Sequence, residues 1–385
     1  MRRFSVLALC SVLAIPAPAV AQNPPGDAGA SAAAHRASAF PALTVTRKVR
    51  GLETPWDVKR LPHGRLLISE RDTHRLIIWR RGHKHQVRFP AHVWVSGETG
   101  LMSLAVDPSF AKNRRIYTCQ GGFTSSGHDV RIVAWRMGQR YRAVRRVKVL
   151  LSGLPATSGR HGGCRLLIAR NGALYVGTGD AATGTNPQNL NSLGGKVLRL
   201  NRITGAPWSS NPWASSSSVR RRYVLNYGHR NVQGLAQRSD GTIWSVEHGP
   251  DRDDEINLVV SGGNYGWNPV PGYNEDVPMT DHSLPGPQVD ARWSSGFPTI
   301  AASGATWVSG TQWGAYNGTL AVAALKGSRL VFFKFDSAGR LLWTRSPAAT
   351  THFGRLRSVT RAGNGDLLVT TSNGTGDSVL RVSPR

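Results

Sequence analysis

Short apolar runs separated by turn residues fill the chain from about Leu43 to its end. Apolar residues at helical spacing over roughly ten positions are hard to find, whereas short runs of β-forming residues are frequent. The pattern therefore predicts an all-β protein.

One unit recurs along this region: a turn that ends in glycine, followed by five residues of β-forming character. The turns His63-Gly64, Asn171-Gly172, Asp240-Gly241, Asn317-Gly318 and Asn364-Gly365 precede RLLIS, ALYVG, TIWSV, TLAVA and DLLVT, respectively. A sixth copy, RIYTC at 115–119, follows a longer turn. Asn-Gly and Asp-Gly favour hairpin turns of type I′, because both central residues of such a turn have positive φ.

Many copies lead into a second strand with a basic and apolar character, as in RLIIWRR at 75–81, RIVAWRM at 131–137, KVLRLNR at 196–202 and SVLRVSP at 378–384. Six units over this region correspond to roughly 55–60 residues each, slightly above a four-stranded blade with its loops. We therefore expect a six-bladed β-propeller of four-stranded antiparallel blades over residues 43–385. Two β-sandwiches are the alternative.

The N-terminal residues are typical of an export signal. Arg2 and Arg3 precede an apolar stretch from Phe4 to Ile15, and Ala19-Val20-Ala21 offers a small-residue cleavage site. Residues 1–21 are thus predicted to be a signal peptide, of the Sec or the Tat type. Residues 22–42, rich in Ala, Gly, Ser and Pro, are predicted to be a flexible linker. The protein is expected to be secreted, periplasmic or at the cell envelope.

Charge and cysteines narrow the picture further. The formal net charge is +26, but the basic residues are dispersed and accompany no nucleic-acid-binding motif, so we expect no nucleic-acid partner. Loose association with an anionic cell envelope stays open.

Cleavage would leave Cys119 and Cys164, and an even pair in an exported protein favours a disulfide. Two buried thiols are the alternative.

Three groups of residues are candidates for chemistry. Asp251, Asp253, Asp254 and Glu255 form an acidic cluster in a Gly/Pro loop, which suits Ca²⁺ or is a solvated loop. His229, Arg230 and Asn231 follow Tyr227-Gly228, and Arg355 and Arg357 share one face if their segment is a strand. Paired arginines on one face can bind a polycarboxylate or phosphate. His161, flanked by glycines, suits a general base. The alternative is that these cations and this histidine are ordinary polar residues of the surface.

Several motifs resemble those of one family. EHGPDRDDEINLVVSGGNYGW and GHRNVQGLA within residues 225–267 resemble the signature of soluble PQQ-dependent glucose dehydrogenases and the wider glucose/sorbosone dehydrogenase group. GETGLMSLAVDPSF at 97–110 and HGGCRLLIARNGALYVGTGD at 161–180 are similar to two further family blocks. The likeness covers roughly residues 43–385, and the family fold is a six-bladed propeller.

The resemblance implies a cofactor site in which PQQ lies over a Ca²⁺ ion. By resemblance, the Gly249 and Pro250 carbonyls bind that Ca²⁺, Arg230 and Asn231 contact the quinone, and Lys326, Arg355 and Arg357 bind the PQQ carboxylates. A second, structural Ca²⁺ would use Glu255, Glu275 and the carbonyls of Pro271 and Tyr273.

The resemblance also implies a reaction. His161 matches the family's catalytic base, which takes the proton of the sugar's anomeric hydroxyl as hydride passes to the quinone. Arg230 and the Ca²⁺ would stabilise the charge that develops there.

The sequence departs from the family pattern on the substrate side. Arg160 stands where glucose enzymes carry a carboxylate, Glu98 where they carry an amide, and an aromatic pair is reduced to Phe297 and Ser294. Glucose specificity is therefore not implied. We expect a PQQ- and Ca²⁺-dependent oxidoreductase of a sugar, or a related alcohol or aldehyde, that passes electrons to an unidentified acceptor. A non-enzymatic glycan-binding propeller is the alternative, and a Ca²⁺-dependent lactonase fits the cations poorly.

Overall fold

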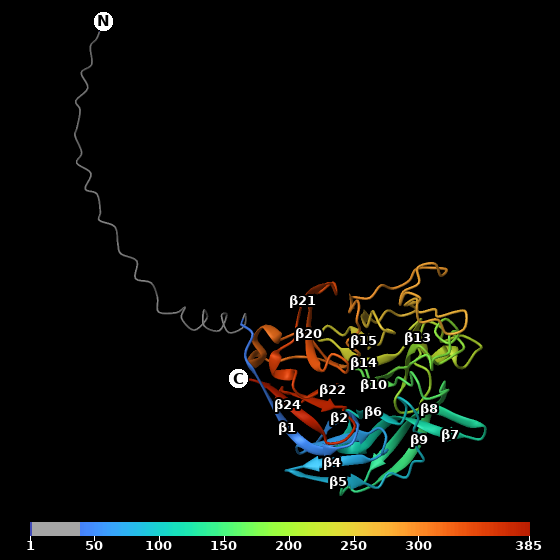
Figure 1. The fold of residues 1–385 in the computed structure, drawn as a ribbon. Helices are drawn as coiled ribbons and strands as arrows, with labels where there is room; N and C mark the ends of the chain where they lie inside the picture. Colours follow the sequence, from blue (N-terminus) through green and yellow to red (C-terminus); the bar gives the residue numbers. More distant parts are fainter. Residues whose placement is uncertain (2–38) are drawn as a thin grey trace.

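The structure is a computed structural model that describes Met1 and residues 39–385. The predicted signal peptide and most of the predicted linker therefore lie outside the described residues. The described chain forms six four-stranded antiparallel sheets, and the first strands of the sheets contact one another in a closed ring. Figure 1 labels most of these inner strands around the centre of the molecule. The six-bladed β-propeller is confirmed, and the two-sandwich alternative is wrong.

In five sheets, the strands follow chain order from the innermost to the outermost strand. In the sixth sheet, β22, β23 and β24 follow this order, and β1 is the outermost strand. The strands of the first three sheets are β2 (Pro55–Leu61), β3 (Arg65–Glu70), β4 (Leu76–Arg80) and β5 (His83–Val87); β6 (Leu101–Val106), β7 (Arg115–Thr124), β8 (Gly127–Met137) and β9 (Val144–Leu154); and β10 (Arg165–Ile168), β11 (Ala173–Gly177), β12 (Lys196–Asn201) and β13 (Val224–Tyr227).

The other three sheets follow the same order. They contain β14 (Val232–Gln237), β15 (Ile243–Glu247), β16 (Glu255–Leu258) and β17 (Trp293–Ser294); β18 (Ala302–Trp307), β19 (Leu320–Ala324), β20 (Arg329–Phe335) and β21 (Leu341–Arg345); and β22 (Leu356–Arg361), β23 (Leu367–Thr371), β24 (Asp377–Pro384) and β1 (Leu43–Leu52). Short helical turns are α2 (Phe110–Asn113), η1 (Arg221–Tyr223), η2 (Thr311–Tyr316) and η3 (Ala348–Thr350). In the described residues, no helix has the length and apolarity needed to span a bilayer.

The recurring units fall at equivalent places in the blades. The five-residue runs form the second strands, β3, β7, β11, β15, β19 and β23, and the basic and apolar phrases form third strands. The long turn before RIYTC holds α2. The turn type differs from the prediction: both residues of His63-Gly64 have positive φ, but in the other four turns only the glycine does. In three of these, at Asn171, Asp240 and Asn364, the side-chain oxygen instead accepts the N–H two residues later.

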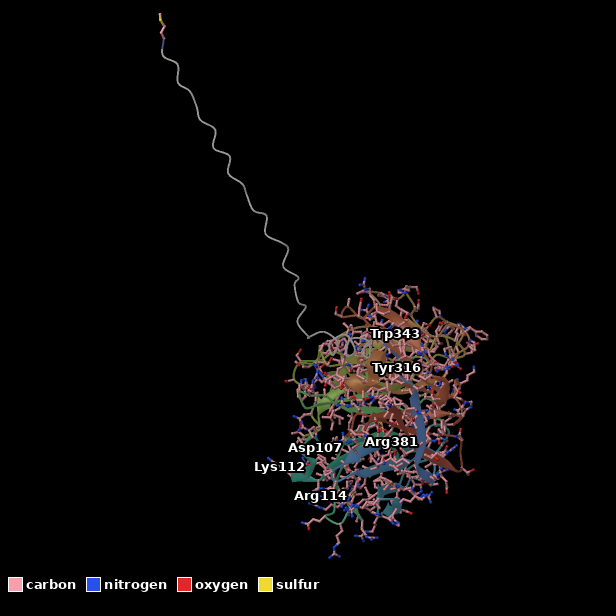
Figure 2. The ribbon with its side chains drawn as sticks, turned by 90° about the vertical axis from the view of Figure 1, so that its left-hand side faces the viewer. Asp107, Lys112, Arg114, Tyr316, Trp343 and Arg381 are labelled. Carbon is pink, nitrogen blue, oxygen red and sulfur yellow. A yellow bond between two sulfur atoms is a disulfide. The ribbon has the colours of Figure 1, made fainter. Side chains whose placement is uncertain are left out.

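The ring closes where the two ends of the described chain meet. β1 pairs with β24 over most of its length, from Leu43 opposite Pro384 to Leu52 opposite Asp377. Just before β1, the ring of Phe40 packs edge-on against Tyr316 and Trp343, with centroids 5.0 and 5.2 Å away. Figure 2 labels both partners near each other in the upper part of the molecule as drawn.

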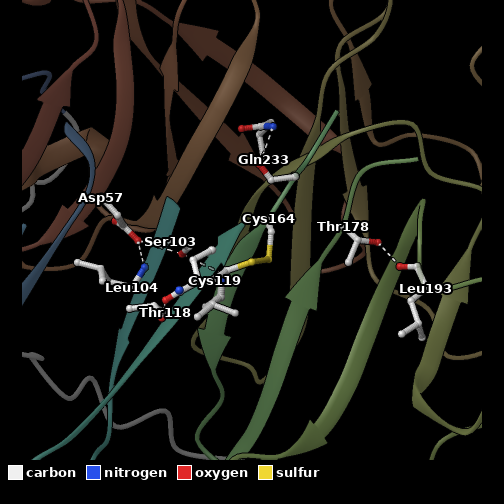
Figure 3. The surroundings of a disulfide bond; sticks show 12 residues. Asp57, Ser103, Leu104, Thr118, Cys119, Cys164, Thr178, Leu193 and Gln233 are labelled. Carbon is white, nitrogen blue, oxygen red and sulfur yellow. Dashed lines mark hydrogen bonds between the residues drawn. A yellow bond between two sulfur atoms is a disulfide. The ribbon is translucent and has the colours of Figure 1, made fainter. Parts of the chain in front are cut away.

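The apolar core lies between neighbouring blades. One buried cluster joins Val49 of β1 and Leu368 of β23 to Val58 and Ile68 of the next sheet. A sheet of this kind buries both faces only when flanked by two others, so the six sheets stabilise one another. The disulfide between Cys119 of β7 and Cys164, just before β10, also joins two adjacent blades (Figure 3). The predicted disulfide is confirmed.

The propeller has two faces, which carry different sets of links and turns. We call the upper face the one formed by the links from each blade to the next and by the turns between second and third strands. The lower face holds the turns between first and second strands, including the five glycine turns above. This follows from the alternating strand directions within each sheet.

Candidate active site

The predicted site residues come from many loops but reach the same face. Glu98, His161, Arg230, Asn231, Phe297 and Arg355 lie in links between blades, Arg357 lies near the start of β22, and Gly249, Pro250 and Lys326 lie in turns between second and third strands. All of these positions belong to the upper face. Pro271, Tyr273 and Glu275 lie in the 259–292 segment, which contacts the end of β13 through a bridge between Asn264 and Tyr227.

His161 is buried and held from one side. Its Nδ1 lies 2.9 Å from Asp180 Oδ1 and 2.9 Å from the Tyr273 hydroxyl. The Tyr273 hydroxyl donates to Asp180 Oδ2 at 2.8 Å, as does Trp267 Nε1. Because Asp180 is an acceptor, the hydrogen-bond network assigns the ring proton to Nδ1. His161 Nε2 has no hydrogen-bond partner among the described residues, so its lone pair is available to a substrate.

The backbone around His161 is shaped for this position. His161 has a φ of 51°, and its carbonyl lies against Gly179, where a Cβ would approach the carbonyl oxygen to 1.9 Å. Only glycine fits that contact. Because Gly179 precedes Asp180 in the chain, the close approach brings the Asp180 carboxylate within reach of the imidazole.

Glu98 links His161 to the next blade. One oxygen of this half-buried carboxylate accepts the His161 backbone N–H at 3.1 Å and the Asn231 side-chain amide at 3.2 Å. The Asn231 oxygen accepts from Gln233 at 3.0 Å, and Gln233 in turn accepts from Arg357 at 2.9 Å. Glu98, His161, Asn231 and Arg357 therefore form one connected group.

Arg230 enters the same group from the other side. Its guanidinium forms an ion pair with Glu275, donates to the His248 carbonyl at 3.2 Å and lies 5.7 Å from the Trp267 ring centroid. Glu275 also binds Arg160 at 2.5 Å. Burial raises the pKa of Glu275, but hydrogen bonds from the two arginines outweigh it and hold the pKa below its usual range.

The site is strongly positive at its centre. Burial lowers the pKa of His248 well below its ordinary value, and the neighbouring charges of Arg357, Arg230 and Arg355 lower it further, so this ring is neutral. Burial, together with nearby arginines, also lowers the pKa of Arg357 to about 9. In the described residues, Arg230 Nε, Arg357 Nε and His248 Nε2 are buried without a hydrogen-bond partner. Buried unpaired donors are rare in proteins, and an anionic ligand with several oxygens would satisfy them.

Three predicted residues lie at the margin of this group. Arg355, Lys326 and Phe297 are exposed, the last with 78% of its surface accessible. Among the described residues, the side chains of Lys326 and Phe297 form no hydrogen bond to the central group. Arg355 is close enough to affect the pKa of His248.

The predicted metal ligands have different surroundings. The Gly249 N–H donates to Asp254 Oδ1 at 3.1 Å, and burial raises the pKa of Asp254 to about 6. Glu255 is buried beside Glu247 and Asn257, whereas Glu275 binds Arg160 and Arg230. Over Met1 and residues 39–385, no three His, Cys, Asp or Glu side chains are grouped as a metal site would require. The predicted Ca²⁺ ligands, several of them backbone carbonyls, stay a prediction.

Sequence reasoning missed Asp180, Trp267 and His248. Asp180 ends the GTGD phrase after β11, and His248 lies in EHGP after β15. Both directly follow second strands, at the upper face, and a search for polar residues at those strand ends would have found them.

The chain is similar to proteins of one known family. The profile described as Glucose / Sorbosone dehydrogenase matches residues 52–381. The chain belongs to the glucose/sorbosone dehydrogenase family.

Two of the named relatives and structures are similar to most of the chain, and one is similar to less than half of it. An aldose sugar dehydrogenase of Escherichia coli is 27% identical, covering 87% of this chain and 91% of the relative. A quinoprotein glucose dehydrogenase B of Acinetobacter calcoaceticus is 33% identical over 47% of this chain and 42% of its own. The PQQ-bound structure of an aldose sugar dehydrogenase from Streptomyces coelicolor is 28% identical, covers 90% of this chain and all of its own, and has a TM-score of 0.74. These names are those of sugar oxidoreductases.

Proposed function

We propose that this protein is a PQQ- and Ca²⁺-dependent dehydrogenase that oxidises a sugar or a related alcohol or aldehyde. The observation that carries the proposal is His161, whose Nδ1 is fixed by Asp180 while Nε2 stays free beside a cluster of arginines. The PQQ-bound relative from Streptomyces coelicolor and the quinoprotein from Acinetobacter calcoaceticus support the choice of cofactor.

The residues present suit a tricarboxylate such as PQQ. Arg355, Arg357 and Lys326 would bind its carboxylates, and Arg230 and Asn231 would contact the quinone. The unpaired Arg230 Nε and Arg357 Nε supply buried donors that an oxygen-rich ligand would satisfy. PQQ, when bound, supplies the acceptor for the two electrons of the oxidation.

Ca²⁺ is proposed on the chemistry of the loop after β15. The Gly249 and Pro250 carbonyls are hard oxygen donors. Asp254 holds this loop by accepting the N–H groups of Gly249, Ile300 and Ala302. Glu255, Glu275 and the carbonyls of Pro271 and Tyr273 are the proposed ligands of a second Ca²⁺.

His161 would remove the proton of the substrate hydroxyl at Nε2. Asp180 stabilises the imidazolium that forms, because its negatively charged carboxylate accepts a hydrogen bond from the Nδ1–H group. Glu98 lies against the His161 backbone, and Phe297 is exposed on the same face. We propose both as substrate-side residues, with the electrons passing finally to an external acceptor. We also propose export by the N-terminal signal.

Reconstitution tests this function. Purified protein with added PQQ and Ca²⁺ should show a quinone absorbance change and dye reduction with at least one member of a panel of aldoses, related aldehydes and sugar-polymer ends. His161→Ala should retain PQQ binding and lower the rate at least about 10²-fold, because a general base is removed. A chain that binds PQQ more weakly than millimolar but holds a glycan tightly would be a binding protein instead.

A further inference from the structure

A large cavity opens on the lower face of the propeller, opposite the candidate active site. Its volume is about 780 Å³, and residues of all six inner strands line it, so it lies on the propeller axis. The Asn317-Gly318 turn and Lys334 add to its rim. None of the residues proposed to bind substrate, cofactor or metal lines this cavity.

The lining of the cavity is strongly basic. Seven of its residues are Lys or Arg, and none is Asp or Glu. Asp57 and Asp240, outside the lining, compensate three of these cations through ion pairs. The other four, Arg60, Arg170, Lys334 and Arg361, form no ion pair within residues 39–385. Burial and the nearby charge of Arg238 lower the pKa of Lys334, as expected where like charges are crowded.

Two buried donors in the lining lack partners. Arg165 and Trp307 both line the cavity, with exposures of 4% and 9%. Arg165 Nη2 and Trp307 Nε1 have no hydrogen-bond acceptor in the described part of the chain. Such donors carry a free-energy cost unless an acceptor is supplied.

We propose that the lower cavity binds a small multivalent oxyanion, either a phosphate compound or a polycarboxylate. Guanidinium and ammonium groups from several strands surround the cavity, which matches a ligand with several charged oxygens. A monovalent anion would leave most of these cations uncompensated. The proposal does not depend on the proposed dehydrogenase activity.

A layer of side chains separates this cavity from the upper face. Arg165 Nε donates to the Gln233 carbonyl at 2.7 Å, while the Gln233 side chain bonds upward to Asn231 and Arg357. Asp57 holds Arg165 from the side at 3.1 Å. An oxyanion in the lower cavity would therefore occupy a site distinct from that of the carboxylates on the upper face.

Calorimetric titration of the full chain with pyrophosphate and with citrate, at low ionic strength, tests the proposal. At least one of these probes should bind, and Lys334→Gln and Arg361→Gln should each weaken that binding about tenfold, since each loses a charge-assisted hydrogen bond. Arg220→Gln is the matched control, because it removes the same charge from an exposed position outside the cavity lining. It should change the affinity less than twofold. The tighter probe identifies the phosphate or the carboxylate class.

A further variant separates the two faces. Arg355→Gln, on the upper face, should leave this binding event unchanged. The proposal is overturned if neither probe binds at millimolar concentration, or if Arg220→Gln weakens binding as much as Lys334→Gln. It is also overturned if Arg355→Gln is the only variant that weakens binding. Because Arg361 is exposed, Arg361→Gln keeps the test valid even if Lys334→Gln fails to fold.

Discussion

At the scale of single residues, Asp180 organises the candidate active site. Its two oxygens accept hydrogen bonds from His161 Nδ1, the Ala182 N–H, Trp267 Nε1 and the Tyr273 hydroxyl. An ionised carboxylate can accept four bonds, but an amide cannot. The tautomer of His161 therefore depends on the charge and acceptor capacity of Asp180.

We predict that Asp180→Asn lowers kcat by about 10²–10⁴-fold. The side-chain amide would favour the tautomer of His161 that carries its proton on Nε2, so Nε2 could no longer accept the substrate proton. KM should change little, as Asp180 lies behind His161. Steady-state kinetics of the reconstituted enzyme measure both. Tyr273→Phe keeps the carboxylate and should cost less than about tenfold. A folded Asp180→Asn enzyme with near-normal kcat would contradict the assigned role.

The sequence anticipated part of this site. His161, Arg230, Asn231 and Arg357 were singled out, and they form one group in the structure. Asp180 and Trp267 were not, because they meet His161 only after three segments of the chain fold together. The pairing of Arg230 with Glu275 was likewise beyond the sequence, since nothing in it places the 259–292 segment beside Arg230.

At the scale of strands, the inner ring depends on one buried carboxylate. Asp57 of β2 accepts from Ser103 Oγ and the Leu104 N–H of β6, both at 3.0 Å (Figure 3). It also pairs with Lys59 and Arg165. Burial raises the pKa of Asp57, but the charges of Lys59 and Arg165 outweigh it and hold the pKa below its usual value. Asp57 thus joins three inner strands.

We predict that Asp57→Asn destabilises the fold by about 3–5 kcal/mol at pH 7, because Arg165 stays buried without its counter-charge. Since the folded pKa is lowered, this stabilisation exists above the unfolded pKa of 3.8 and is lost as pH falls through the folded value. The difference from the unsubstituted protein should therefore shrink below about pH 4. Denaturant unfolding at several pH values measures it. Asp290→Asn, at an exposed site, should change stability by less than about 0.5 kcal/mol.

Strand positions were more predictable than turn geometry. Period and composition located the second strand of every blade, since a pleated, buried strand selects β-branched and apolar residues. The same Asn-Gly and Asp-Gly pairs did not fix the turn type, because side-chain oxygens at Asn171, Asp240 and Asn364 capped a backbone N–H. That local bond substitutes for the second residue with positive φ.

At the scale of the whole molecule, closure is achieved at two places. β1 and β24 complete the last blade with strands from opposite ends of the described chain. The Cys119–Cys164 disulfide ties the second blade to the third, and both cysteines lie in the largest apolar cluster. The first closure uses backbone hydrogen bonds and the second a covalent bond, so they respond differently to reducing conditions.

We predict that Cys119→Ala/Cys164→Ala lowers the free energy of unfolding by roughly 4 kcal/mol, the loop-entropy value for a cross-link of this span. Part of any loss in the double variant comes from packing, because both sulfurs are fully buried. Unfolding the unsubstituted protein with and without a reductant isolates the cross-link, since reduced cysteines retain their volume. The reductant should lower the stability of the unsubstituted protein and leave the double variant unchanged. Equal stability of the oxidised and reduced chains would mean that packing between the blades, and not the covalent bond, closes this side of the ring.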